Sequence, residues 1–342
     1  MKALITGGSG YFGSLFLQKL TKQGIDCRIF DLNDINERLS NVEFFQGDIR
    51  NYFSVANACK GIDVVYHNVA QVPLAKDKAL FHSVNVTGTE NILKAAKAAS
   101  VKKVVYTSSS AVFGIPATNP VTEEMQPYPM EAYGRSKYEG EQLCQRFVEQ
   151  GLDVSIIRPR TIMGHGRLGI FQVLFEWIYQ GTNIPVLNNG ANVYQFVHAD
   201  DLAEACLLAS QRSGANVFNC GAEEYGTMKE VLENLCEFAG TGSRVKNVPM
   251  GPAVTCMKVT SKIGLLPLGA YHSLMYGRSM YFDNSKIKKE LRWKPQYSND
   301  QMFIESYKWY LKNRSKVLKV KRGSHHRIAL KPGILKLASW FL

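Results

Sequence analysis

The sequence predicts an α/β fold, a Rossmann doubly wound parallel sheet of about seven strands with a smaller mixed lobe. Three observations predict it: short apolar runs alternate with helical patterns as far as Gly164, a glycine-rich turn follows the first run, and residues 198–220 resume the alternation. Strands that alternate with helices pair in parallel and are covered by helices on both faces.

The individual elements follow from apolar periodicity. The helical patterns between strands include 90–99 and 133–150, and a further helix at 169–181 lies outside the alternation. The predicted strands are the apolar runs at 2–6, 26–31, 42–45, 62–67, 102–109, 153–159 and 216–220.

The turn after the first strand has the residues of a dinucleotide-binding loop. Gly7, Gly10 and Gly13 allow a tight turn, a close approach of backbone to a pyrophosphate, and close packing of helix on strand. The N–H groups at the start of the helix are suited to phosphates. Asp31 ends the second strand 18 residues after Gly13, where a carboxylate accepts ribose hydroxyls and repels a 2′-phosphate, so the predicted cofactor is NAD. The alternative is a glycine turn that binds no ligand.

The break in periodicity predicts two lobes and a tail. The smaller lobe is rich in Gly, Pro, Tyr and short segments, which is typical of a substrate-binding region inserted beside a nucleotide-binding sheet. The predicted boundaries are 1–165 with 196–220 for the NAD-binding domain, 166–195 with 221–311 for the substrate lobe, and 312–342 for a basic C-terminal tail.

The net charge of +12 is concentrated in that tail. From Lys312 onward there are nine Lys or Arg and no acidic residue, which leaves a net charge of +3 for the rest of the chain. No basic face with interleaved aromatic residues precedes the tail, so we expect no nucleic-acid partner. The tail ends in GILKLASWFL, and a basic segment beside an apolar one predicts peripheral contact of 312–342 with an acidic membrane. The alternative is a solvated segment whose apolar end folds back on the body or on a partner chain.

The location predicted for the protein is cytoplasmic, possibly at the inner face of the membrane through the tail. No run approaches the ~20 apolar residues of a spanning helix, and the N-terminus enters a strand without a signal-peptide pattern. The seven cysteines are scattered without a C-x-x-C motif and are expected to be reduced core residues.

Tyr133 and Lys137 are the candidate catalytic pair. They lie four residues apart on a predicted helix and therefore share a face. An ammonium beside a phenol, together with a positive nicotinamide, lowers the pKa of the phenol toward the range where a general acid or base works best. Such pairs are common on exposed helices, but here the run YTSSSAVFG precedes the pair at the carboxyl edge of the sheet, where this fold binds ligands.

Over residues 1 to about 311 the chain resembles the extended short-chain dehydrogenase/reductase superfamily, in the NAD-dependent epimerase/dehydratase group. It is similar also to the 3β-hydroxysteroid dehydrogenase branch in FQVLFEWI, YQFVHADD and YGRSMYFDNSKIKKELRWKPQYS. The motifs that carry the main resemblance are TGGSGYFG, the strand-end Asp31, GDI at 47–49, HNVA at 67–70, NVTGT at 85–89, YTSSSAVFG, YGRSK, RPRTIMGHG and FVHADDLAEA.

The resemblance implies roles for further residues. Ser109, counted back five from Gly114, would hydrogen-bond the reacting oxygen, with Ser110 as the alternative, and Lys137 would hold the nicotinamide ribose. Ser109 could instead end the strand with its hydroxyl on backbone, and Asn85 could be a helix cap. Asp48 and Ile49 are implied to flank the adenine, and Asn68 to Ala70 to pass under the cofactor. The implied NAD contacts are Gly7, Gly10, Tyr11, Phe12, Gly13, Asp31, Asp48, Ile49, Asn68, Val69, Ala70, Asn85, Thr107, Ser108, Tyr133, Lys137 and Pro159.

Departures from the family pattern narrow the reaction. Dehydratases of the group carry an Asp-Glu pair directly after the catalytic Ser or Thr, and decarboxylating members carry a Glu there. This chain has Ser110 and Ala111. Dehydration is therefore not expected.

The residues that usually bind the substrate diphosphate in this family also differ in this chain. The Asn and Arg that usually supply it are replaced by Thr161 and Tyr194, so Arg160, Arg167 or Arg278 would have to grip instead. Arg160 could equally form a surface ion pair. The candidate substrate contacts are Ser110, Arg160, Thr161 and Tyr194.

The predicted function is NAD-dependent hydride transfer at a secondary hydroxyl or ketone, with a nucleotide sugar as the small-molecule substrate. One alternative is a hydroxysteroid-dehydrogenase-like enzyme with an apolar substrate, whose pocket would use aromatic residues such as Phe171, Trp177 and Phe196 if they are not simply core. Another is a non-catalytic NAD sensor. The resemblance suggests a homodimer built from the helices at 90–99 and 133–150.

No metal site is predicted. His165 and His198 have no metal-ligand spacing with other His or acidic residues, and we expect His198 to make a structural hydrogen bond near the sheet edge.

Overall fold

The computed structural model describes residues 1–34, 41–72, 79–169, 171–249, 275 and 277–318. Its main feature is a seven-stranded sheet in the order β10-β6-β5-β4-β1-β2-β3, with every pairing parallel. The α/β prediction is confirmed, and each predicted strand is found to within two residues at either end. The strands are β1 (Lys2–Thr6), β2 (Asp26–Asp31), β3 (Glu43–Gln46), β4 (Val64–His67), β5 (Lys103–Thr107), β6 (Val154–Pro159) and β10 (Asn216–Cys220).

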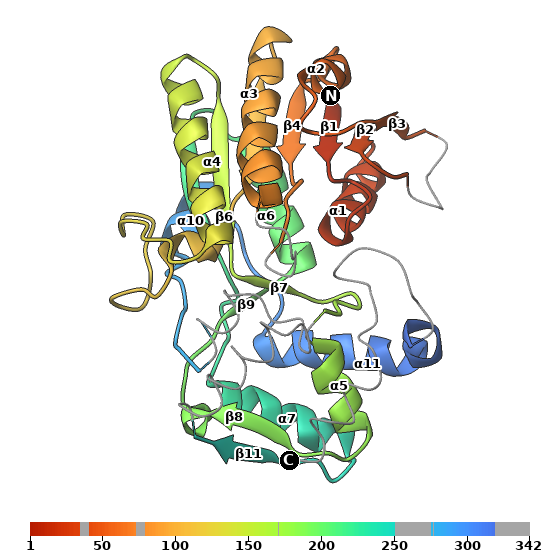
Figure 1. Ribbon diagram of the computed structural model, residues 1–342, viewed down its shortest axis with the longest axis vertical. Coiled ribbons are helices and arrows are strands. Elements are labelled where there is room, and N and C mark those ends of the chain that lie inside the picture. Colours follow the sequence, from red (N-terminus) through yellow and green to blue (C-terminus); the bar gives the residue numbers. More distant parts are fainter. Residues whose placement is uncertain (35–40, 73–78, 170, 250–274, 276, 319–342) are drawn as a thin grey trace.

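Helices cover both faces of the sheet, which is why its strands are apolar on both sides (Figure 1). One core lies between the sheet and α1, α6 and α10, and the other between the sheet and α2, α3 and α4. The bounds of these helices are Tyr11–Lys22 for α1, Tyr52–Cys59 for α2, Gly88–Ala98 for α3, Ala132–Glu149 for α4, Ala199–Gln211 for α6 and Ser285–Leu291 for α10.

A smaller lobe lies beyond the carboxyl edge of the main sheet, toward which the strand arrows point in Figure 1. Helices α5 (Phe171–Tyr179), α7 (Met228–Ala239) and α11 (Asn299–Val317) share one apolar core with the edge of a small parallel sheet, β8 (Ile184–Leu187) and β11 (Val245–Val248). A parallel pair, β7 and β9, connects the lobes, and short helical turns complete the described elements: β7 (Thr161–Met163), β9 (Phe196–His198), η1 (Phe81–Thr87), η2 (Ser110–Phe113) and η3 (Asn188–Gly190).

Part of the chain assigned from sequence to the substrate lobe packs on the main sheet. Ile287, Leu291 and Trp293 join the core beneath α1 and α6, and Trp293 Nε1 donates to the carbonyl of Asp201 at 2.9 Å. The division of 221–311 from the Rossmann domain is therefore a coarse one. Six of the seven cysteines are buried and free, as expected, and Cys256 lies outside the described residues.

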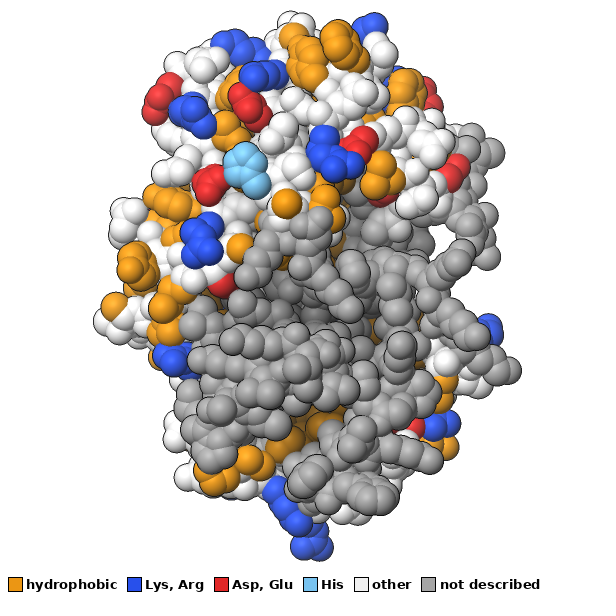
Figure 2. Space-filling view, in the orientation of Figure 1, with side chains coloured by type: hydrophobic (Ala, Val, Ile, Leu, Met, Phe, Trp, Pro, Cys, Tyr) orange, Lys and Arg blue, Asp and Glu red, His pale blue; other side chains and the backbone are white. Residues whose placement is uncertain are grey.

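The surface charges of the Rossmann domain are mixed. On the face shown in Figure 2, Lys and Arg side chains stand among Asp and Glu side chains instead of gathering in one patch. Among the described residues, no helix has the length and apolar character needed to cross a membrane. The predicted membrane contact falls mostly on residues 319–342, which lie outside the described residues; only the start of the tail is seen, as the last turns of α11.

Candidate active site

The glycine loop between β1 and α1 forms as its spacing predicts. Gly7 has φ of +71°, which favours glycine, and a Cβ on Gly13 would lie 2.1 Å from the carbonyl oxygen of Gly7. The backbone N–H of Ser9 donates to the Asp31 carboxylate at 3.1 Å, so the loop and the end of β2 are tied together. Burial raises the pKa of Asp31, while the N–H groups of Ser9, Asn33 and Leu32 act in the opposite direction. The loop leaves room for a pyrophosphate where a side chain would otherwise stand.

A cavity of about 500 Å³ opens at this loop and extends into the smaller lobe. The structure brings most of the predicted site residues to its wall, and this arrangement fits a dinucleotide lying along the carboxyl edge of the sheet. Those residues are Gly7, Gly10, Tyr11, Phe12, Gly13, Asp31, Asn68, Val69, Ala70, Thr107, Ser108, Ser109, Ser110, Tyr133, Lys137, Pro159, Arg160, Thr161 and Tyr194.

Three predicted cofactor contacts are not part of the wall. The Asp48 carboxylate binds the Arg50 side chain, and Ile49 is 4% exposed and packs in the core beneath α2 and α3. Asn85 holds the backbone of Gln71 by two hydrogen bonds, of 2.7 and 3.1 Å, and donates to Ser136 Oγ. It lies inside η1 and does not cap a helix, so the cap interpretation was wrong. Its amide instead supports the cavity wall at Gln71.

Helix α4 carries Tyr133 and Lys137 to the cavity. Its first turn is fixed by Glu131, whose carboxylate accepts the N–H groups of Tyr133 and Gly134. A Cβ on Gly134 would lie 2.4 Å from the carbonyl oxygen of Ala111, so this glycine allows α4 to approach η2. Tyr133 and Lys137 therefore face the end of β5 from the same side of the helix.

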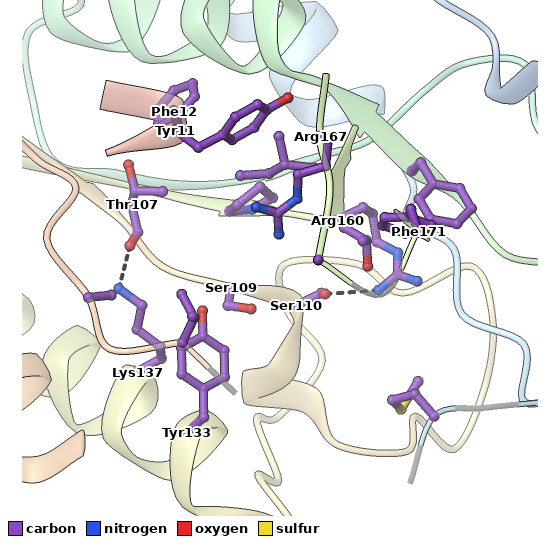
Figure 3. Close-up of a pocket in the computed structure, with 18 of the residues that line it drawn as sticks. Tyr11, Phe12, Thr107, Ser109, Ser110, Tyr133, Lys137, Arg160, Arg167 and Phe171 are labelled. Atoms are coloured by element: carbon purple, nitrogen blue, oxygen red, sulfur yellow. Dashed lines mark hydrogen bonds between the residues drawn. The ribbon is translucent and has the colours of Figure 1, made fainter. Parts of the chain in front are cut away.

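The three-serine run leaves β5 directly opposite α4. Ser109 caps η2, with its Oγ accepting the N–H of Ala111 at 3.1 Å. Figure 3 shows Ser109, Ser110 and the phenol of Tyr133 around one space. Ser109 has the backbone bond expected of a strand-end residue, and its hydroxyl hydrogen stays available to a second acceptor.

The electrostatics of the pair differ from the expectation. Burial raises the pKa of Tyr133 to about 12, and the effects that lower it come from the Ser109 hydroxyl and the Arg167 charge. Lys137 Nζ donates to the carbonyl of Thr107 at 2.7 Å, and burial lowers the pKa of Lys137 to about 8. Lys137 is not among the groups that lower the phenol pKa, because its ammonium is held on the Thr107 carbonyl. The lowering expected from Lys137 together with a nicotinamide stays a prediction.

The candidate substrate residues form one cluster. Arg160 is 1% exposed, donates to Ser110 Oγ at 2.8 Å and lies over the ring of Tyr194 at 4.5 Å. Thr161 and Tyr194 share a hydrogen bond of 2.9 Å between their hydroxyls. The surface ion-pair interpretation of Arg160 was wrong, because the side chain is buried and lines the cavity.

The sequence did not predict the apolar part of the cavity wall, most of which the smaller lobe supplies. Arg167 and Leu168 follow β7, and most of the remaining residues come from β8, the turn after η3, α7 and the segment after residue 274; two others lie in the loop after β4 and in β7. No local motif distinguishes them from core residues, and only the packing of the two lobes reveals them. They are Val72, Ile162, Leu168, Gly169, Val186, Leu187, Asn192, Met228, Leu232, Met275 and Gly277, in addition to Phe171 and Phe196, which were named as candidates for an apolar pocket.

Two histidines that are far apart in sequence meet beside α11. Ligand-capable atoms of His165, His198 and Glu305 lie within 4.8 Å of one another. His198 Nε2 is 2.9 Å from Glu305, its Nδ1 accepts the N–H of Asp200, and His165 Nε2 is 2.8 Å from the Asp200 carboxylate. The structural hydrogen bond expected of His198 is present, and it connects β9 to α11 and to the start of α6. The spacing rule missed this proximity because α11 supplies Glu305.

A Rossmann domain whose glycine loop faces a Tyr-x-x-x-Lys helix defines an extended short-chain dehydrogenase/reductase. Residues 3–221 match the family described as NAD dependent epimerase/dehydratase family. The chain belongs to this family, and its cofactor is NAD. The glycine loop, Asp31 and the residues along the sheet edge fit that cofactor.

Similar proteins have several activities. An uncharacterized protein of Sinorhizobium fredii, y4nG, is 52% identical over 99% of this chain and 86% of its own length. A UDP-glucose 4-epimerase of Lactobacillus helveticus is 28% identical over 91% and 97%, and a human sterol-4-alpha-carboxylate 3-dehydrogenase, decarboxylating, is 29% identical over 62% and 58%. The structure of UDP-glucose 4-epimerase from Thermotoga maritima, solved with UDP-glucose, matches with a TM-score of 0.75 and 22% identity over 92% of this chain and 100% of that one.

Proposed function

We propose that this protein transfers hydride at a secondary hydroxyl or ketone of a nucleotide sugar, with Tyr133 as general acid or base. The observation that carries the proposal is the convergence of Tyr133, Ser109 and Lys137 on the cavity formed by the glycine loop. The UDP-glucose 4-epimerase relative covers nearly the whole chain, which favours a sugar nucleotide.

When bound, NAD supplies the hydride acceptor or donor and, in its oxidised form, a positive charge near the phenol. Tyr133 moves the proton: with a pKa raised to about 12, its phenol is protonated at neutral pH and donates that proton to a ketone oxygen as the carbon is reduced. Oxidation of the hydroxyl is the reverse step, in which the phenolate left by this donation takes the hydroxyl proton back. The Ser109 hydroxyl orients the reacting oxygen. Lys137, held on the carbonyl of Thr107, would bind the nicotinamide ribose.

An apolar substrate is the second candidate. The wall contributed by the smaller lobe includes Leu168, Phe171, Val186 and Leu232, which suit a large hydrocarbon skeleton. The sterol dehydrogenase relative supports this candidate, although it matches over only part of the chain.

The experiment offers the NAD-loaded enzyme UDP-sugars and 3-hydroxysteroids and follows nicotinamide absorbance, together with epimer formation by chromatography. We expect turnover of UDP-sugars and binding of UDP in the micromolar range by calorimetry. Turnover of the steroids without binding of any nucleoside diphosphate would establish the second candidate, and NAD binding without turnover of either class would contradict the catalytic proposal.

A further inference from the structure

Arg160 is a buried cation without a carboxylate partner among the described residues. Its side chain is 1% exposed, and its one hydrogen bond runs from Nη1 to Ser110 Oγ at 2.8 Å. Within the described part of the chain, Nε and Nη2 have no hydrogen-bond partner. The rings of Tyr194 and Phe282 lie 4.5 and 5.6 Å from the guanidinium and stabilise its charge without offering it an oxygen. A buried arginine whose donors are unpaired within the described residues is suited to bind an anion.

The other arginines at buried carboxylates show what is missing. Arg158, two residues earlier on β6, donates from Nε and Nη2 to the two oxygens of Glu141, at 2.9 and 2.6 Å. Arg314 uses the same two nitrogens on Glu176, at 2.8 and 2.7 Å. Both pairs use the edge of the guanidinium formed by Nε and Nη2. In Arg160 this same edge has no partner among the described residues.

The position of Arg160 in the cavity indicates where an anion bound by it would lie. Arg160 and Ser110 both line the cavity, and Ser110 directly follows Ser109, the candidate partner of the reacting oxygen. Because the α-carbons of consecutive residues are about 3.8 Å apart, Ser110 and Ser109 lie side by side at the cavity. Figure 3 shows Arg160 directed at Ser110, beside the space that Ser109 and Tyr133 face. A group bound there belongs to the part of the substrate that reacts.

We propose that Arg160 and Ser110 bind a carboxylate that the substrate carries close to the reacting carbon, so that the enzyme acts on an acidic sugar or another hydroxy acid. This inference rests on the proposed hydride transfer and names its substrate class. Arg160 would supply two parallel N–H donors and Ser110 its free hydroxyl hydrogen. The free edge is covered from water, so the carboxylate reaches it with a shift of neighbouring side chains, which is common on ligand binding.

A diphosphate is the other anion that a guanidinium could bind here. It would stand on the far side of the sugar from the reacting hydroxyl, whereas Arg160 is joined through Ser110 to the residue next to Ser109. The carboxylate fits this position and the planar edge of Arg160 better. A carboxylate site and a diphosphate site at Arg160 predict opposite results for two substrates that share a diphosphate and differ in a carboxylate.

The test compares UDP-glucuronate with UDP-glucose on the NAD-loaded enzyme, since these differ only by a carboxylate in place of a hydroxymethyl group. We expect kcat/KM to favour the acid by about 100-fold, as for a buried charge pair. Arg160→Gln should remove this preference by lowering kcat/KM for the acid about 100-fold more than kcat/KM for UDP-glucose, and Arg160→Lys should restore part of the preference. Arg244→Gln, at an exposed arginine of the smaller lobe, is the control and should leave both values unchanged.

The outcomes separate the possibilities. Equal loss on both sugars in Arg160→Gln would assign the arginine to the diphosphate and overturn the inference. Turnover of UDP-glucose with no preference for the acid would overturn it while leaving the proposed function intact. If neither sugar reacts, the nucleotide-sugar proposal fails, and 3-hydroxysteroids with and without a 4-carboxylate become the deciding pair: an Arg160-dependent preference for the acid supports the carboxylate site, and no preference or no reaction rejects it.

Discussion

The ion pair between Arg158 and Glu141 joins β6 to α4, the helix that carries Tyr133 and Lys137. Both side chains are nearly buried, with 6% and 5% exposed, and they share two hydrogen bonds of 2.9 and 2.6 Å. Glu141, which lies one turn after Lys137 on α4, also accepts a hydrogen bond of 2.5 Å from the hydroxyl of Ser108. Ser108 directly precedes Ser109. Glu141 therefore holds α4 both to β6, through Arg158, and to the end of β5, through Ser108.

Glu141→Gln preserves the shape of the side chain and removes its charge, which leaves Arg158 buried without a counter-charge. Breaking a buried pair in this way costs about 3–5 kcal/mol of unfolding free energy. The glutamine still offers one oxygen, so we expect a loss of about 3 kcal/mol, measured by urea unfolding, and a fall in kcat because Ser109 and Tyr133 lose their fixed spacing.

The matched control is Glu139→Gln on the same helix, where the side chain is 45% exposed and the expected change is within about 0.5 kcal/mol. A loss in Glu141→Gln no larger than that of the control would refute the argument that Glu141 holds α4 to the sheet.

Three further predictions concern the cofactor loop and the histidine cluster. Gly13→Ala should abolish detectable NAD binding in calorimetry, because its Cβ would meet the Gly7 carbonyl at 2.1 Å; retained affinity would contradict the loop geometry. Asp31→Asn should lower the ratio of NAD to NADP affinity by at least about 10-fold, because the repulsion of the 2′-phosphate is lost; an unchanged ratio would show that Asp31 does not select the cofactor. The Asp200 carboxylate raises the pKa of His165 above its usual value, so the stability that this contact contributes is full below about pH 6.5 and is lost as the pH rises through the raised pKa. The Tm difference between wild type and His165→Gln should therefore be larger at pH 5.5 than at pH 8, and a difference independent of pH would refute the assignment.

The sequence predicted the main sheet well because its strands are apolar on both faces and are separated by strong turn signals. It also predicted which residues meet at the carboxyl edge, since parallel strands end there and the glycine loop, YTSSSAVFG and YGRSK each follow a strand or begin a helix. These are local signals, and the parallel topology alone brings them together.

The rest of the site depends on contacts that no local pattern encodes. The cavity wall of the smaller lobe comes from residues such as Val186 and Leu232, which look like core in the sequence. Asn85 matched a cofactor motif but supports Gln71, and the pKa of Tyr133 depends on the burial of the phenol and on Arg167. Each of these outcomes is decided by the packing of segments far apart in the chain.

The most direct test of proton transfer by Tyr133 is the rate of hydride transfer in Tyr133→Phe. This rate is followed by nicotinamide absorbance in single turnover, and NAD affinity is measured on the same preparation. We predict that the rate falls by at least about 100-fold, because general acid–base catalysis is lost, while the Kd for NAD changes less than about 2-fold. Wild-type rates in this variant would contradict the role of the phenol in proton transfer, and a loss of NAD binding equal to the loss of rate would show that Tyr133 serves the cofactor site alone.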